Sequence, residues 1–374
     1  MSAGDRVLIS EVHAHGTDLE AARVRRRASL LARTGGGVLV SPVLAGERVL
    51  YPGLRHRPIR VAPGLSPDAL AAEVAERVGD VLDDLRPHLV HAMGVSCAIP
   101  ALLRRRGGCR IVIEPGLLPS QWLRDHEPKL PPERLSDMVA LEDRTLARAD
   151  AVVARSMIEG ATLVQRGVSH ERIHTALDGV PLGVDAGDAP DLPNVIYIGD
   201  TAPWSGHRVP LDGLARVHRP WRLTVVVPPE APAGTFEAQA RALRVAERLT
   251  VSRDASFENL VSRLRGAAVV ICPLLHTRAT EAGGVLPEAA LWALAAGRPL
   301  VASELPIVRT YAGAAARYFE PGDAERLAEH LRVLLSDPMA RHALADAAVA
   351  VAGTLEWGAT ERPVADLWAM LLES

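Results

Sequence analysis

The amino-acid sequence predicts an α/β protein made of two doubly wound domains, and three observations support this. Short apolar runs alternate with longer helical patterns along the chain, as in the βαβ units that build parallel sheets. The 374 residues are enough for two domains, each with its own core. Residues 185–193, rich in Pro, Asp and Gly, separate the two halves. Because ligands of such sheets bind beyond the carboxyl ends of the strands, we expect the site in the cleft between the domains.

The first half contains short apolar runs that we expect to be strands, with helical patterns between them. The expected strands are residues 7–10, 37–41, 89–92, 110–113 and 151–154. The expected helices are residues 19–33, 67–85, 98–106 and 135–148.

The second half repeats the alternation. The expected strands are residues 195–198, 223–227, 249–251, 269–272, 300–302 and 316–319. The expected helices are residues 210–217, 235–247, 257–264, 287–296 and 324–335.

Composition narrows the class of protein. Hydrophobic residues at 48% and charged residues at 23% fit a globular enzyme, and a net charge of −3 gives no footprint for nucleic acid. Cys97, Cys109 and Cys272 lack the spacing of metal ligands and lie near apolar runs, which predicts buried thiols. The sequence has no signal peptide and no apolar run of membrane-spanning length, so we expect a cytoplasmic protein.

The most informative segment is residues 281–335. It contains Ala293-Leu-Ala-Ala-Gly-Arg-Pro299 before an apolar run, then Pro321-Gly-Asp323 before a helical pattern. With residues 141–156, 172–180 and 194–206 in their order and spacing, this resembles the GT-B glycosyltransferases of family 4 type (glycosyltransferase group 1) over nearly the whole chain.

The resemblance implies the GT-B fold: a Rossmann-like acceptor domain at 1–187, a Rossmann-like donor domain at 188–356, and a helix at 357–374 that crosses back to the first domain. It also implies a metal-independent, retaining, hexosyltransferase-type enzyme. Such an enzyme moves a sugar from a nucleotide sugar to a small-molecule acceptor and needs no cofactor beyond that substrate.

Three parts of the family's site are replaced. Asp200 and Ser205 occupy the positions where the family has the Arg and the Lys that stabilise the leaving diphosphate. Trp292 occupies the position of the glutamate that holds the donor ribose. In the first domain, Pro115 stands where a histidine normally contacts the transferred sugar. We therefore expect a non-standard donor, acceptor or bond, as in the tailoring of a specialised metabolite.

The resemblance places the donor against residues 199–205 and 280–288. Arg278 is a candidate replacement for the missing cations, against a solvated loop arginine, and Glu288 for a hydroxyl contact, against a helix-terminal glutamate. Gly283 and Gly284, like Gly16 in the first domain, let a phosphate approach backbone N–H groups or simply form turns. The candidate donor-binding residues are Gly16, Thr201, Ser205, Arg278, Glu281, Gly283, Gly284 and Glu288.

Two candidates lie in the first domain. Glu114 follows a strand at the carboxyl edge of a parallel sheet, so we predict an acid/base role for it, with a surface glutamate at a turn as the alternative. His91, as in the family, is a candidate for acceptor binding, with a structural histidine as the alternative.

Arginine clusters at 23–27 and 104–106 allow several interpretations. They suit helix ends, an anionic acceptor or an anionic lipid surface, but bulky aromatic residues are missing from the first cluster, so we expect no membrane contact.

Two other functions remain open. The joint replacement of several site residues also fits a non-catalytic pseudo-glycosyltransferase that binds a sugar or nucleotide or supports a protein partner. A third option retains an enzyme with epimerase-like or phosphorylase-like chemistry.

Overall fold

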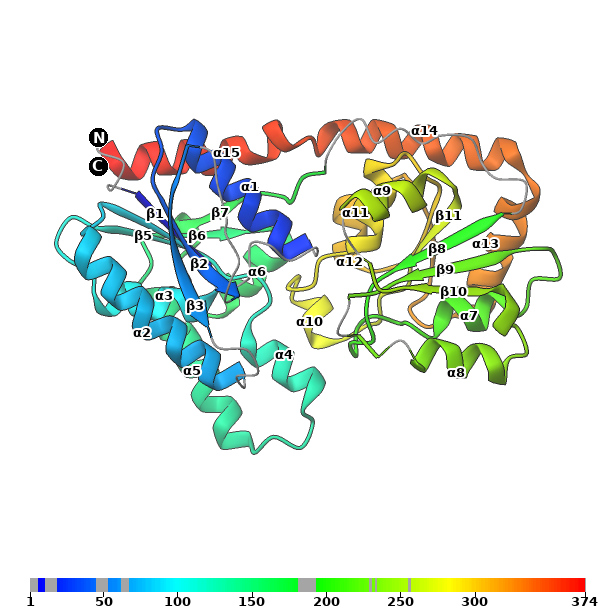
Figure 1. Cartoon of the computed structure of the whole chain (residues 1–374), viewed down its shortest axis with the longest axis horizontal. Helices are drawn as coiled ribbons and strands as arrows, with labels where there is room; N and C mark the ends of the chain where they lie inside the picture. Colours follow the sequence, from blue (N-terminus) through cyan, green and yellow to red (C-terminus); the bar gives the residue numbers. More distant parts are fainter. Residues whose placement is uncertain are drawn as a thin grey trace. The chain divides into compact units, whose positions relative to one another are not determined.

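The chain is described by a computed structural model (Figure 1). Its described residues are 6–10, 19–44, 53–61, 67–180, 193–228, 231–232, 234–254 and 257–373. The chain divides into two compact units. Unit 1 comprises residues 1–178 and 360–374, and unit 2 comprises residues 179–359. The chain thus leaves unit 1 after Asp178 and returns to it at Thr360, where the sequence places the domain boundaries at 187/188 and 356/357.

Unit 1 is a parallel sheet with helices on both faces. Its strands are β1 (Arg6–Ser10), β2 (Val38–Leu44), β3 (Arg55–Val61), β4 (Leu89–Met93), β5 (Arg110–Glu114), β6 (Ala151–Ala154) and β7 (Ile173–Thr175). Its helices are α1 (Leu19–Arg33), α2 (Pro67–Leu85), α3 (Val95–Leu103), α4 (Pro119–His126), α5 (Pro132–Ala147), α6 (Met157–Gln165) and the short 3₁₀ helix η1 (His170–Arg172).

The strand order in unit 1 is β3-β2-β1-β4-β5-β6-β7. The chain builds outward from β1 in one direction and then from β4 in the other, so β1 and β4 flank the switch point of the sheet. Their register pairs Arg6 with Leu89 and Ser10 with Met93. The carboxyl ends of β1, β4 and β5 therefore lie at the same edge of the sheet. The helix α1 begins at this edge.

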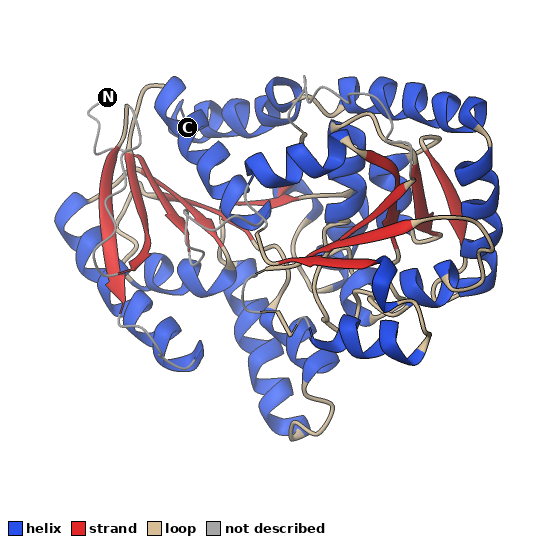
Figure 2. Ribbon diagram, turned by 45° about the vertical axis from the view of Figure 1, so that its right-hand side comes forward, coloured by secondary structure: helices blue, strands red, loops and turns tan. Residues whose placement is uncertain are grey.

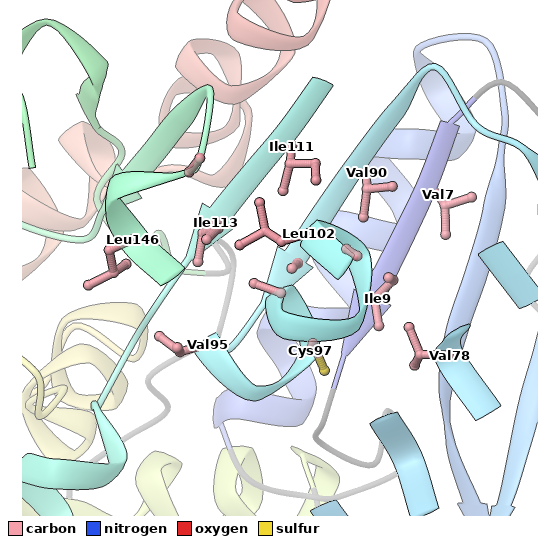
Figure 3. Close-up of a cluster of buried hydrophobic side chains, with 14 of the residues drawn as sticks. Val7, Ile9, Val78, Val90, Val95, Cys97, Leu102, Ile111, Ile113 and Leu146 are labelled. Carbon is pink, nitrogen blue, oxygen red and sulfur yellow. The ribbon is translucent and has the colours of Figure 1, made fainter. Parts of the chain in front are cut away.

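Apolar side chains from the strands of unit 1 pack against α2, α3 and α5 in one buried cluster (Figure 3). These residues are fully or nearly fully buried, as expected for strands that are covered on both faces. Labelled members are Val7, Ile9, Val78, Val90, Val95, Cys97, Leu102, Ile111, Ile113 and Leu146.

Unit 2 repeats the architecture. Its strands are β8 (Asn194–Ile198), β9 (Arg222–Val226), β10 (Leu249–Ser252), β11 (Ala267–Cys272), β12 (Leu300–Ser303) and β13 (Ala316–Phe319). Its helices are α7 (Val209–Leu214), α8 (Gly234–Ala242), η2 (Ala246–Arg248), α9 (Phe257–Arg265), α10 (Arg278–Glu281), α11 (Glu288–Ala295), α12 (Pro306–Ala312), α13 (Ala324–Ser336) and α14 (Pro338–Thr354).

The strand order in unit 2 is β10-β9-β8-β11-β12-β13, and β8 and β11 flank its switch point. Figure 2 shows the strands in each unit flanked by helices. All strand pairings among the described residues of both units are parallel, which confirms the predicted fold class of two Rossmann-like doubly wound sheets.

The last helix, α15 (Trp357–Glu373), packs on unit 1 from residue 360 onward. Val364, Leu367 and Trp368 share a buried cluster with Leu8 of β1 and Val24 of α1. The three cysteines are buried and free, which confirms their prediction as buried thiols.

Candidate functional site

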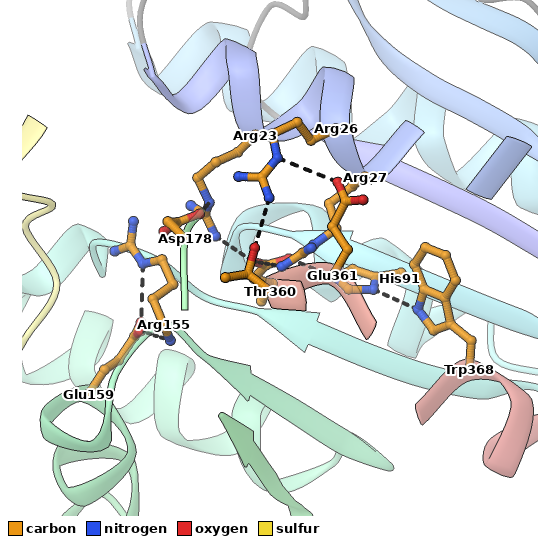
Figure 4. Close-up of polar contacts among 11 residues, drawn as sticks. Arg23, Arg26, Arg27, His91, Arg155, Glu159, Asp178, Thr360, Glu361 and Trp368 are labelled. Atoms are coloured by element: carbon orange, nitrogen blue, oxygen red, sulfur yellow. Dashed lines mark hydrogen bonds and ion pairs between the residues drawn. The ribbon is translucent and has the colours of Figure 1, made fainter. Parts of the chain in front are cut away.

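A buried carboxylate, Glu114, lies at the carboxyl edge of the sheet of unit 1, and Figure 4 shows its partners Arg23, Arg27 and His91. Glu114 is the last residue of β5, and its side chain is 0% exposed. Arg27 donates to it from Nε (3.0 Å) and from a terminal nitrogen (3.1 Å), and Arg23 donates to its Oε1. Both arginines come from α1, four residues apart and so on one face of the helix. Glu114 thus joins β5 to α1.

His91 of β4 makes the fourth contact to this carboxylate. Its Nε2 lies 3.1 Å from Glu114 Oε2, and the indole N–H of Trp368 donates to its Nδ1 at 2.9 Å. Since an indole nitrogen can only donate, Nδ1 is the acceptor and Nε2 carries the proton given to Glu114. Burial lowers the pKa of His91, which favours this neutral form. The ring therefore links β5 to α15.

The arginines of α1 also hold the two points where the chain crosses between the units. Asp178 is the last residue before the chain leaves unit 1, and its carboxylate pairs with Arg23 Nε at 2.9 Å. Thr360 is the first residue after the chain returns to unit 1. Arg26 donates to the hydroxyl of Thr360 at 3.2 Å and also pairs with Glu361. Arg23 and Arg27 are buried at 6% and 4% exposure, so these two face carboxylates rather than a lipid surface.

The charge state of Glu114 follows from its partners. Burial alone would raise its pKa, but the charges of Arg27 and Arg23 and the hydrogen bond from His91 outweigh burial and hold the pKa well below its ordinary value. Glu114 is therefore an ionised, enclosed carboxylate. It lies at the edge the sequence indicates, but its side chain turns inward rather than lying at a surface turn.

A second buried carboxylate, which the sequence analysis missed, lies beyond β6. Glu159 of α6 accepts from the backbone N–H of Arg155 at 2.6 Å, and Ser156 caps the same helix. Burial raises the pKa of Glu159 to about 7. The Ser-x-x-Glu pattern of a capping box was the signal in the sequence. Among the described residues, Glu159 is thus a buried carboxyl group whose pKa lies near neutral pH.

In unit 2 the connections that follow β8 and β11, which contain the residues expected at the donor, are joined at the switch point. The β8–α7 connection contains Thr201 and Ser205, and the segment after β11 contains Arg278 to Glu288. The backbone N–H of Leu275 donates to the carbonyl of Trp204 at 2.7 Å. A Cβ on Gly206 would lie 1.8 Å from the carbonyl oxygen of Pro273, so only glycine permits this approach.

The β8–α7 connection is held by its own side chains. Burial raises the pKa of Tyr197, and its protonated hydroxyl donates to the carbonyl of Asp200 at 2.9 Å. The Asp200 carboxylate accepts from the N–H of Ala202 at 2.9 Å in an Asx-type turn. Ser205 is 4% exposed and lies 3.2 Å from His207 Nδ1, whereas Thr201 is half-buried. Asp200 and Ser205 therefore shape this loop.

The segment after β11 presents both exposed and buried candidates. Arg278 and Glu281 are exposed on α10, and Glu281 pairs with His276 at 3.2 Å. Gly283, with φ of +73°, turns the chain, and the N–H of Gly284 donates back to Ala279 at 3.0 Å. The glycines thus close a tight turn after α10 rather than presenting these N–H groups outward.

The turn leads into α11, whose first residue is Glu288. This glutamate is half-buried, and Trp292, one turn later, is 5% exposed. The amino end of α11 and the exposed Arg278 supply positive potential beside the turn. Such an arrangement attracts anionic groups.

The structure thus groups the predicted residues into two sets. In unit 1, Glu114 and His91 are hydrogen-bonded to each other. In unit 2, Thr201 and Ser205 lie on the connection after β8. The other donor candidates of unit 2 lie on the segment after β11, and they are Arg278, Glu281, Gly283, Gly284 and Glu288. Gly16 lies outside the described residues. Among the residues described, no cluster of three or more His, Cys, Asp or Glu could hold a metal ion. None of the described helices combines the length and apolar character that crossing a membrane requires.

Comparisons with known proteins match both units. Residues 9–177 match the family described as glycosyl transferase 4-like domain, and residues 192–337 match glycosyl transferases group 1. No curated protein matches significantly.

Several solved structures share the fold. Sucrose-phosphate synthase from Thermosynechococcus elongatus is 17% identical, with a TM-score of 0.82 over 99% of both chains. WaaG, a glycosyltransferase of lipopolysaccharide biosynthesis, is 16% identical over 97% of this chain and 99% of its own, with a TM-score of 0.72. Anabaena HepE in complex with UDP-glucose is 14% identical over 98% and 99%, with a TM-score of 0.69. The chain therefore belongs to the GT-B glycosyltransferases of the group 1, family 4-like type.

Proposed function

We propose that this glycosyltransferase moves a sugar from a nucleotide-sugar donor to a small-molecule acceptor in specialised metabolism. The observation that carries the donor part is the joining of the two donor segments in unit 2. Trp204 and Leu275 bond them at the carboxyl ends of β8 and β11, the switch point where doubly wound sheets bind ligands. The complex of HepE with UDP-glucose supports a donor of this class.

The residues of unit 2 take separate roles in this proposal. Arg278 and the amino end of α11 stabilise the diphosphate as negative charge develops on the leaving group. Thr201 and Ser205 form part of the opposite loop, and Gly283 and Gly284 form the tight turn between α10 and α11. Glu288 accepts a hydrogen bond from a sugar or ribose hydroxyl, and Glu281 flanks the site from α10.

The donor site is non-standard because the positions that the family fills with cations are used for loop structure. Asp200 and Ser205 bond to neighbouring residues, so the positive charge has to come from elsewhere. Arg278 is exposed and makes no ion pair with the described residues. We assign to it the function of the missing pair and expect weaker charge neutralisation, which favours an unusual donor.

Ligand binding tests the proposal. Calorimetry with UDP, GDP, ADP, dTDP and their common sugar conjugates should identify one base that binds, and a ligand at 100 times its Kd should stabilise the native state by roughly 2.7 kcal/mol. Arg278→Gln should raise the Kd of that ligand about tenfold or more, because a hydrogen bond to a charged group is lost. The matched control, Arg253→Gln, removes another exposed arginine of unit 2. Equal affinity in both variants contradicts the role of Arg278, and no binding by any nucleotide favours the non-catalytic alternative.

The reaction itself is tested with the donor found in that screen. We expect retention of anomeric configuration, read by proton NMR of the first product formed, and full activity after treatment with EDTA. Inversion, or loss of turnover that Mg²⁺ or Mn²⁺ restores, would overturn the retaining and metal-independent parts of the proposal while leaving the donor site in place.

A further inference from the structure

A second candidate ligand site lies in unit 2 at the amino ends of β9 and β10, the opposite strand ends from the donor segments. An open cavity of about 610 Å³ is formed there by the α7–β9 connection and the η2–β10 junction. Its volume falls within the range of small-molecule sites. Its lining residues are Ala215, Val217, His218, Arg219, Pro220, Trp221, Arg222, Val245, Glu247 and Arg248.

The inner part of this basal cavity is apolar and fixed. Val217 and Trp221 are 3% and 2% exposed, and the indole N–H of Trp221 donates to the carbonyl of Val217 at 3.3 Å. The guanidinium of Arg248 lies 5.0 Å from the centre of the Trp221 ring, in cation–π geometry. One arginine is therefore already positioned over an aromatic wall.

The rim of the basal cavity carries an excess of positive charge. His218, Arg219 and Arg222 are exposed, and the cavity has one carboxylate, Glu247, which pairs with Arg248 at 3.6 Å. Within the described part of the chain, Arg219 and Arg222 make no ion pair or side-chain hydrogen bond. Guanidinium groups that share a cavity repel one another, and a bound anion would turn that repulsion into attraction.

We propose that the basal cavity binds a phosphorylated small molecule, with its phosphate on Arg219 and Arg222 and its apolar body against Pro220 and Val245, the apolar lining residues that are exposed or half-buried. The planar fork of arginine matches phosphate oxygens in pairs, which a single ammonium group does not. This site is additional to the donor site and does not depend on it, because the two lie at opposite ends of the strands of one sheet.

Calorimetry on the full chain with phenyl phosphate, inorganic phosphate and phenol tests the proposal. Phenyl phosphate should bind most tightly, because it alone supplies both the charge and the apolar body. Arg219→Gln/Arg222→Gln should raise its Kd about tenfold or more, the scale of losing hydrogen bonds to a charged group. The control Arg241→Gln/Arg332→Gln removes the same charge from exposed positions of α8 and α13, and Arg278→Gln tests the donor site; both should bind normally.

A second measurement localises binding in the wild-type protein. The indole N–H signal of Trp221, assigned through Trp221→Phe, should shift in proton–nitrogen NMR spectra on addition of phenyl phosphate. The proposal is overturned by an unchanged Trp221 signal, by equal affinity in the Arg219/Arg222 variant and the control, or by loss of binding in Arg278→Gln alone, which would place the ligand at the donor site.

Discussion

The replacement Glu114→Gln separates a structural carboxylate from a catalytic one. It keeps the shape of the side chain and removes its charge. In the wild type, Arg27 donates two hydrogen bonds to this carboxylate, while Arg23 and His91 donate one each, all in a buried environment. The variant leaves Arg27 buried without its countercharge, whereas Arg23 retains Asp178.

The expected cost follows from these contacts. Removing one partner of a buried ion pair typically costs about 3–5 kcal/mol, because the other charge stays buried. Since Arg23 keeps a second carboxylate, we expect a loss of about 3 kcal/mol in the free energy of unfolding of unit 1. The pKa of Glu114 is depressed in the folded state, so its stabilisation is complete above its ordinary pKa and is lost as pH falls through the folded value. The free energy of unfolding of the variant should therefore lack this decrease at acid pH.

Urea unfolding followed by circular dichroism measures the loss. Hydrogen exchange of residues 19–33 and 360–373 assigns it to unit 1, because two units can unfold separately. Glu76→Gln, at an exposed position of α2, is the matched control. A variant within about 0.5 kcal/mol of the wild type, with unchanged exchange, would refute the reasoning. If such a stable variant also lost turnover, the acid/base role that the sequence predicts would be supported instead.

Three further changes test other contacts. Gly206→Ala places a Cβ against the carbonyl of Pro273 at a φ of +60°. It should lower the free energy of unfolding by more than about 3 kcal/mol and abolish nucleotide binding. The control Gly234→Ala, with open space around it, should be tolerated. Glu159 has a folded pKa raised to about 7, so folding takes up a proton between its ordinary pKa and 7, and stability should fall as pH rises through that window; Glu159→Gln should remove this slope in urea titrations at several pH values. Trp368→Phe leaves a buried ring nitrogen without its donor and should cost about 1–3 kcal/mol in the same unfolding assay.

Most of the fold is predictable because buried parallel strands are short apolar runs. The bounds of α1 and α2 agree with the sequence pattern, and β11 (Ala267–Cys272) contains the predicted strand 269–272 and begins two residues before it. The strand β3 was missed for a physical reason. It is an edge strand that pairs with β2 alone, so three arginines and Pro58 are tolerated in it, and it shows no apolar run.

The site was less predictable because its partners are distant in sequence. That Glu114 lies at a sheet edge follows from the strand pattern, but its enclosure depends on Arg27, 87 residues away. His91 and Trp368, 277 residues apart, meet through a helix that returns to unit 1. For the partners of Glu114, the local signal was the four-residue spacing of Arg23 and Arg27. Whether that face turns toward solvent or toward a carboxylate depends on tertiary packing.

The return of α15 to unit 1 has a consequence for how the chain is made. Ribosomal synthesis releases residues 179–359 as one continuous stretch, so unit 2 can fold as soon as they emerge. Unit 1 begins earlier but lacks Val364, Leu367 and Trp368, which complete the cluster around Leu8 and Val24. One apolar cluster of the first unit to be translated therefore becomes complete only after the whole of unit 2 has been made.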